Sequence, residues 1–117
     1  MTTPADILKR MTDEIFNQPD ATARERAIGE LCSPSIRFVD AEGEVEGGDA
    51  FASKITALLA SGDPSFRFHS ASPYRQVAEL ATHTWALGVS AESPVLTGTD
   101  VAIVKEGRIE SLYTLLN

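Results

Sequence analysis

The chain has 117 residues, of which 43% are hydrophobic and 23% are charged. This composition is typical of one globular domain, and it argues against intrinsic disorder and against two independent domains. The formal net charge of -7 at pH 7 repels phosphate backbones and anionic lipid surfaces. We therefore expect no nucleic-acid partner and no membrane partner.

The cysteine content and the apolar runs indicate the compartment. Cys32 is the single cysteine, so it cannot form an internal disulfide, and its apolar neighbours indicate a small buried thiol in a reducing compartment. The sequence has no signal-peptide pattern near its start and no apolar run close to the ~20 residues that span a bilayer. A cytoplasmic protein is the expectation.

Three helices are expected in the first 60 residues. Thr3 to Asp6 form a capping box with a proline at the first helical position, and the helical stripe that follows ends near 17–20. Thr22 and Glu25 begin a second helix over roughly 21–32, which the Ser33-Pro34 pair ends. A third helix opens at Gly47-Gly48 and stops at 61–64.

Strands occupy the rest of the chain. Residues 35–40 alternate with a period of two, so that Ile36, Phe38 and Asp40 share one face, and 44–46 can return as a short strand. Further strands are expected at 66–74, 81–90, 95–105 and 108–116, with a loop near 75–79 and a hairpin at Glu106-Gly107. Short connections make successive strands antiparallel. The fold class is α+β, with the helices covering one face of a curved sheet and a cavity between them.

Several common sites are missing from the sequence. It contains no phosphate-binding glycine loop and no nucleophile elbow. His69 and His83 are the only histidines, and neither has a partner at metal-ligand spacing. The five acids between Asp40 and Asp49 do not match a calcium loop, because Val45 and Phe51 occupy its glycine and glutamate positions. No metal and no cofactor are expected.

Two aspartates remain as candidate catalytic residues. Asp40 ends a strand face with apolar neighbours and can act as a general base; the alternative, which this feature alone favours, is that it caps the adjacent turn. Asp100 lies inside a strand, where aspartate is disfavoured, on a face with small and apolar residues. It is either a buried acid that donates a hydrogen bond or a structural acid satisfied by the backbone, Arg37 or Arg67.

Four segments in order carry a family resemblance: 36–40, 47–51, 98–101 and 106–109. With the helix order, they make nearly the whole chain resemble the nuclear transport factor 2-like superfamily, in particular its SnoaL-like and ketosteroid-isomerase-like branch. The resemblance implies a cone-shaped curved antiparallel sheet packed against three helices (a cystatin-like α+β barrel), a deep apolar pocket, and commonly a homodimer formed across the sheets.

The same resemblance implies roles for the two acids. Asp40 matches the aspartate that shuttles the proton in ketosteroid isomerases, and Asp100 matches the protonated aspartate of their oxyanion hole. Their third member, a tyrosine of the first helix, falls near Ile15 or Phe16, and neither side chain can donate a hydrogen bond. This departure argues against steroid isomerisation itself, since one lost donor costs about a hundredfold in rate or more.

The resulting hypothesis is a SnoaL-like protein that binds a small apolar organic ligand, either as a cofactor-free isomerase or cyclase or as a non-catalytic binding or dimeric interaction module. The expected ligand-binding side chains are Phe16, Phe38, Trp85, Leu112 and Leu116, although Trp85 also fits a plain core or interface position. The expected homodimer face carries Thr99, Val101 and Ile103, with His83 or Trp85 nearby.

Overall fold

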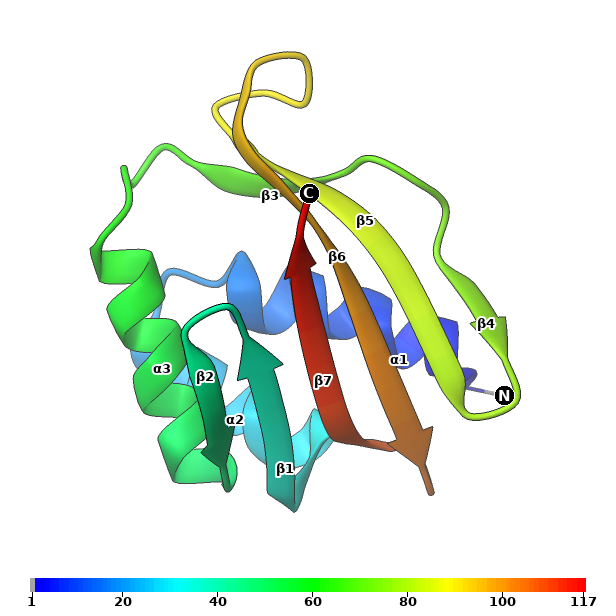
Figure 1. The fold of residues 1–117 in the computed structure, drawn as a ribbon. Coiled ribbons are helices and arrows are strands. Elements are labelled where there is room, and N and C mark those ends of the chain that lie inside the picture. Colours follow the sequence, from blue (N-terminus) through cyan, green and yellow to red (C-terminus); the bar gives the residue numbers. More distant parts are fainter. Residues whose placement is uncertain (1) are drawn as a thin grey trace.

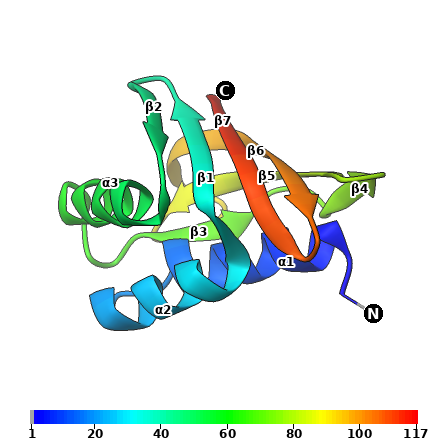
Figure 2. The same cartoon turned by 90° about the horizontal axis from the view of Figure 1, so that it is seen from below.

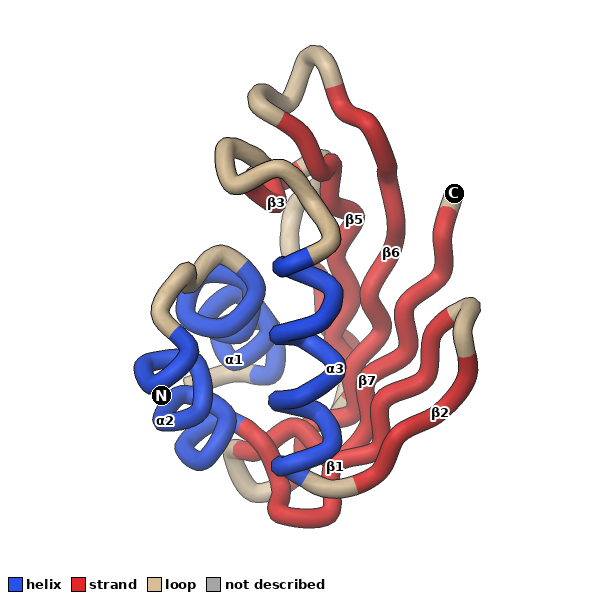
Figure 3. The backbone as a smooth tube through the Cα atoms, turned by 90° about the vertical axis from the view of Figure 1, so that its left-hand side faces the viewer, coloured by secondary structure: helices blue, strands red, loops and turns tan. Residues whose placement is uncertain are grey.

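The computed structural model describes residues 2–117, in which helices lie against one face of a seven-stranded sheet (Figure 1). The helices are α1 (Pro4–Met11), a π-helical turn η1 (Thr12–Phe16), α2 (Ala21–Leu31) and α3 (Gly48–Ala60). Figure 3 shows the helices together on one side of the sheet. Seen from below, α1 and α2 lie next to each other while α3 lies beside β2 (Figure 2).

The first helix begins as the sequence predicts and then changes its winding. Thr3 and Asp6 form the capping box, each side chain accepting a hydrogen bond from the other's backbone amide. Beyond Met11 the helix widens, and the amide of Asn17 reaches back five residues to the carbonyl oxygen of Thr12 at 2.9 Å. Such π-turns are rare and occur often at functional sites. Here the turn leads into the polar rim of the cavity described below.

The seven strands form one mixed sheet in the order β2-β1-β7-β6-β5-β3, with β4 also paired to β5. The path of strands does not close on itself, so the sheet is a curved, open half-barrel. The strands are β1 (Cys32–Asp40), β2 (Gly43–Glu46), β3 (Arg67–Ser70), β4 (Arg75–Val77), β5 (Leu80–Gly88), β6 (Pro94–Lys105) and β7 (Arg108–Leu116).

The α+β class is confirmed, with three differences in the sheet. The strand expected over 66–74 is shorter, and the loop expected near 75–79 is wrong, because Arg75–Val77 pairs with β5 as strand β4. The pair formed by β1 and β7 is parallel. The rule that short connections give antiparallel pairs applies to successive strands, whereas β1 and β7 are joined through most of the chain.

The core lies between the helices and the concave face of the sheet. Leu8, Met11 and Ile15 from the first helix meet Ile36 and Ala102 from the sheet, and all five are fully buried. This packing holds α1 and η1 against the middle of the sheet and leaves space between η1, α3 and the far ends of the strands. No helix among residues 2–117 is long and apolar enough to cross a membrane.

Candidate functional site

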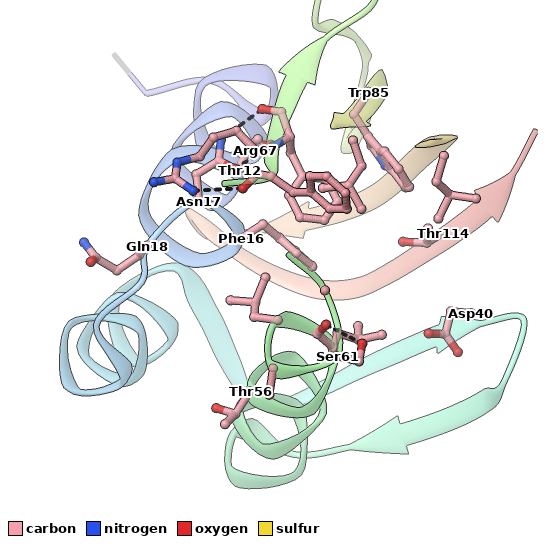
Figure 4. Close-up of a pocket in the computed structure, with 18 of the residues that line it drawn as sticks. Thr12, Phe16, Asn17, Gln18, Asp40, Thr56, Ser61, Arg67, Trp85 and Thr114 are labelled. Carbon is pink, nitrogen blue, oxygen red and sulfur yellow. Dashed lines mark hydrogen bonds between the residues drawn. The ribbon is translucent and has the colours of Figure 1, made fainter. Parts of the chain in front are cut away.

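A cavity of about 680 Å³ opens between η1, the end of α3 and the concave face of the sheet. Figure 4 shows side chains from the helices and from the strands converging on it. Its apolar lining suits a small organic molecule. The apolar and aromatic side chains come from Phe16, Phe38, Leu58, Leu59, Phe66, Phe68, Trp85, Leu87, Leu96 and Leu116.

The sheet register places the two candidate acids on either side of Thr114. Asp100 on β6 is paired directly with Thr114 on β7. On the other side of β7, Val39 is paired with Tyr113, so the next residue of β1, Asp40, continues the row beside Thr114. Asp40, Thr114 and Asp100 all line the cavity. The β6–β7 hairpin and the distant strand β1 thus bring two carboxyl groups and a hydroxyl to one wall.

Asp100 is a buried acid with two hydrogen-bond donors on the same oxygen. The residue is 5% exposed, and its Oδ1 accepts from Trp85 Nε1 at 3.1 Å and from Thr114 Oγ1 at 2.7 Å. Burial raises the pKa of Asp100 to about 6, although both hydrogen bonds act to lower it. Because Oδ1 is occupied by donors, a proton bound by this carboxyl resides on Oδ2, the oxygen left for a ligand.

Neither arginine considered from the sequence pairs with Asp100. Arg37 binds Glu44 and donates to Tyr113 Oη at 2.8 Å. Arg67 donates to the backbone carbonyls of Pro64 and Phe66. The charge of Asp100 therefore has no cationic partner among the described residues, and its neutral form is favoured by burial.

Asp40 has a different environment at the end of β1. Its Oδ1 accepts from the backbone amide of Glu42 at 3.0 Å, which is the turn-capping bond considered as the structural alternative. Its Oδ2 lies 3.5 Å from Lys54 Nζ, and Lys54 also pairs with Glu42. The hydrogen bond to Glu42, with the nearby charge of Asp40, raises the pKa of Lys54. Asp40 is thus an ion-paired carboxylate at the cavity wall.

Trp85 reaches Asp100 because its cross-strand partner is glycine. Trp85 on β5 is paired with Gly98 on β6, and the indole lies over the glycine. A Cβ atom at Gly98 would lie 2.8 Å from Trp85 Cε2, closer than real contacts allow. The same indole packs edge to face with Phe68, with ring centroids 5.1 Å apart.

Most of the predicted ligand-binding side chains line the cavity. Phe16, Phe38, Trp85 and Leu116 do so. Leu112 does not, because it is fully buried in the hydrophobic core under α1.

His83 and Trp85 do not lie on the outer face of the sheet, where the sequence hypothesis placed them near a dimer interface. His83 is paired with Asp100 and is 1% exposed, so its side chain shares the concave face. Trp85 lies two residues further along the same strand, and its indole donates to Asp100. Both are interior residues.

His83 belongs to a polar cluster beside the cavity. Its ring stacks on Tyr74 with centroids 3.6 Å apart, and Nε2 lies 2.9 Å from Ser70 Oγ. Since Ser70 donates to the carbonyl of Ser72, it accepts from Nε2–H, which leaves Nδ1 as a bare lone pair. That nitrogen is buried without a partner, and burial lowers the pKa of His83. The imidazole is a neutral structural group.

Sequence reasoning missed the polar rim of the cavity. Asn17 donates to the carbonyl of Phe68 at 2.9 Å and accepts from its amide at 2.8 Å, which fastens η1 to β3. Thr12, Arg24 and Thr114 also line the cavity. Thr114 could have been found from the sequence, since it follows the register of the last hairpin. Arg24 lies on a helix with a regular apolar stripe, where nothing in the pattern distinguishes it from a surface arginine.

Comparison with known proteins gives a consistent fold family. No protein-family model matches the sequence, and no curated protein matches it significantly. Among solved structures, a candidate isomerase of the SnoaL-like family from Agrobacterium tumefaciens is 27% identical, covers 100% of this chain and 99% of its own, and has a TM-score of 0.87. A candidate polyketide cyclase from Sinorhizobium meliloti is 21% identical over 93% of each chain, with a TM-score of 0.74.

A third neighbour extends the range of the fold. A protein with a cystatin-like fold from Xanthomonas campestris is 16% identical, covers 97% of this chain and 90% of its own, and has a TM-score of 0.77. The structural neighbours are thus SnoaL-like isomerases, polyketide cyclases and related proteins, and the resemblance predicted from the sequence is confirmed.

Proposed function

Because this chain has the nuclear transport factor 2-like fold of the SnoaL-like proteins, we propose that it binds a small apolar carbonyl compound and moves a proton on it without a cofactor, as an isomerase or cyclase. The observation that supports this function is the row of Asp40, Thr114 and Asp100 along one cavity wall. Two carboxyl groups in different environments can divide the roles of base and acid.

The environments of the two acids favour one division of roles. Asp40 pairs with Lys54, and a carboxylate can accept a proton from the carbon next to a carbonyl group. Asp100 is buried, with Oδ2 left for a ligand. When Oδ2 carries a proton, it can donate to the carbonyl oxygen and stabilise the charge that forms there as the enolate develops. Asp40 then returns the proton to a different carbon, which balances an isomerisation.

The proposal is tested with 2-tetralone, a bicyclic ketone of suitable size, and with 2-naphthol, an aromatic analogue of its enol. In D₂O, we expect the protein to speed exchange of the protons next to the carbonyl of 2-tetralone, followed by NMR. Asp40→Asn removes the base and should abolish the acceleration of proton exchange. Asp100→Asn keeps an N–H donor and should retain more of that acceleration. Asp49→Asn, at an exposed acid of α3, is the matched control and should behave as wild type.

One observation favours a second function, a non-catalytic binding module. Both oxygens of the Asp40 carboxylate are engaged, one with the Glu42 amide and one with Lys54, as expected of an acid with a structural role. Binding of 2-naphthol without any acceleration of proton exchange in 2-tetralone would support the module and rule out the proton-transfer function.

We also propose that the chain forms a homodimer through the outer face of its sheet. Thr82, Val101 and Tyr113 form a continuous cross-strand row there, and each is partly exposed. The helices cover the opposite face. A second copy could cover this row, since antiparallel sheets present two faces and one layer of helices covers one.

A further inference from the structure

Arg24 places a buried positive charge at the cavity. The residue lies on α2, is 6% exposed, and is one of the cavity-lining residues. Arginine is seldom buried to this extent without an anionic partner, because removing its charge from water is costly. No sequence pattern distinguishes this residue from a surface arginine, and the proton-transfer proposal assigns it no role.

The guanidinium group of Arg24 has N–H donors that are not used in hydrogen bonds within the chain. One terminal nitrogen donates to the carbonyl oxygen of Gln18 at 2.7 Å, and the other donates to Thr56 Oγ1 at 3.2 Å. Both acceptors are neutral. A guanidinium has five N–H groups in a planar fork, so these two bonds hold Arg24 in place and leave other donors for an acceptor in the cavity.

No ion pair among residues 2–117 neutralises Arg24. Asp20, the N-cap residue of α2, accepts a hydrogen bond from the amide of Ala23 at 2.8 Å through its carboxylate. Asp63, which lines the same cavity, accepts from the amide and the hydroxyl of Ser65. The nearby acids thus have other partners, and the charge of Arg24 is left for a group from outside the chain.

Arg24 and the acid row lie at different ends of the cavity. Figure 4 draws Gln18 and Thr56, the two partners of Arg24, on one side of the cavity and Asp40 and Thr114 on the other. A ligand that occupies the cavity between them would have an apolar body and polar groups at two ends. The wall between the ends is aromatic, with Phe16 and Phe68 packed edge to face at 5.4 Å.

We propose that the ligand is an organic acid whose carboxylate pairs with Arg24 while its carbonyl or enol end reaches Asp100. This inference rests on the proposed function, and it narrows the substrate class to carboxylic acids. A carboxylate matches the planar fork of a guanidinium. Arg67 at the cavity rim adds a second positive charge near the entrance.

The experiment compares 6-hydroxy-2-naphthoic acid with its methyl ester, which differ in charge at one end and share the naphthol ring. Affinities are measured by fluorescence titration at pH 7 and fixed ionic strength. We expect wild type to bind the acid at least about tenfold more tightly than the ester, since a charge-assisted hydrogen bond is roughly twice as strong as a neutral one. Arg24→Gln should remove this preference, and Arg26→Gln, which removes the same charge from an exposed position of α2 outside the cavity lining, should keep it.

The outcomes separate this inference from the proposed function. Absence of an acid preference in wild type, or a preference that survives Arg24→Gln, would overturn the carboxylate site and leave the proton-transfer test untouched. Conversely, an Arg24-dependent acid preference with no proton exchange in 2-tetralone would support the carboxylate site and count against the proposed proton transfer. Asp100→Asn should change the affinity of acid and ester by the same factor.

A second readout covers the case in which Arg24→Gln does not fold, since Arg24 also joins α2 to α3 through Thr56. The Nε–Hε resonance of Arg24 in wild-type protein should shift on addition of the acid and stay in place with the ester. Arg24→Lys keeps the charge and should retain part of the preference. A resonance that responds equally to both compounds would contradict the proposal.

Discussion

The indole of Trp85 on β5 lies over Gly98, its cross-strand partner on β6. The same indole donates a hydrogen bond to Asp100, which lies two residues after Gly98 on β6. This arrangement depends on the missing side chain of Gly98. A methyl group there would overlap the indole, with Trp85 Cε2 2.8 Å from the added atom. Gly98 therefore controls both the shape of the cavity wall and one of the two donors to Asp100.

Gly98→Ala should displace Trp85 and destabilise the fold. We expect a loss of about 1–3 kcal/mol in the free energy of unfolding, measured by urea denaturation, as for other overpacked cores. The tryptophan emission of the folded protein should also shift. Gly29→Ala is the control, because an added Cβ there meets nothing within 4 Å, and alanine favours a helix interior by about 0.5–1 kcal/mol. Equal stability of Gly98→Ala and wild type would show that the indole can move freely.

Asp100 should make stability fall as the pH rises. Its pKa is about 6 in the fold against a usual 3.8, so between these values the folded state holds a proton that the unfolded state has lost. Stability is then full at low pH and decreases through about pH 6. Asp100→Asn removes this loss and should stabilise the protein at pH 8 by up to about 3 kcal/mol, since one pKa unit is worth about 1.4 kcal/mol.

The gain in the free energy of unfolding from Asp100→Asn should shrink to under about 1 kcal/mol at pH 4. Thermal or urea unfolding across the pH range measures this gain. Asp49→Asn, which removes the same charge from an exposed position, should show no comparable trend. A gain that is constant with pH would contradict the buried, partly protonated carboxyl.

Asn17→Ala should loosen the junction between η1 and β3. The substitution removes two hydrogen bonds to the backbone of Phe68, and we expect a loss of about 1–3 kcal/mol in the free energy of unfolding. Hydrogen exchange at the amide of Phe68 should become faster. Asn117→Ala, whose side chain accepts one long hydrogen bond of 3.5 Å from Thr99, is the control and should leave stability unchanged.

Cys32 should be inert in the folded protein. The residue is 2% exposed, and burial raises the pKa of its thiol to about 12, so the reactive thiolate is absent near neutral pH. We expect no reaction with Ellman's reagent at pH 8 until urea unfolds the chain. Rapid labelling of the native protein would show that β1 opens at its first residue.

The proposed homodimer predicts a mass of about twice the chain mass of 12.6 kDa in light scattering at micromolar concentration, since an interface of standard size persists there. Val101→Glu should yield monomers, because it places a charge in the middle of the outer row. Asp49→Asn, on α3 and away from that face, should remain a dimer. A monomer for wild type would contradict this interface.

The sequence by itself determined the helices and most strands, because capping boxes, proline and glycine stops, and the period of the apolar residues are local signals. It also predicted Asp40 and Asp100 as unusual acids, since each interrupts an apolar strand face. The alternation of β6 was sufficient to place Asp100 on the same face as Gly98 and Ala102, and the structure buries all three.

Only the tertiary structure decided what these residues contact. The parallel pairing of β1 with β7 puts Asp40 beside Thr114, and no local pattern encodes a pairing between strands separated by most of the chain. The same holds for Lys54 on α3, which reaches Asp40, and for Arg24, whose burial depends on how α2 packs against α3. Partners of charged side chains are set by packing over long sequence distances, and the period of one element carries no information about them.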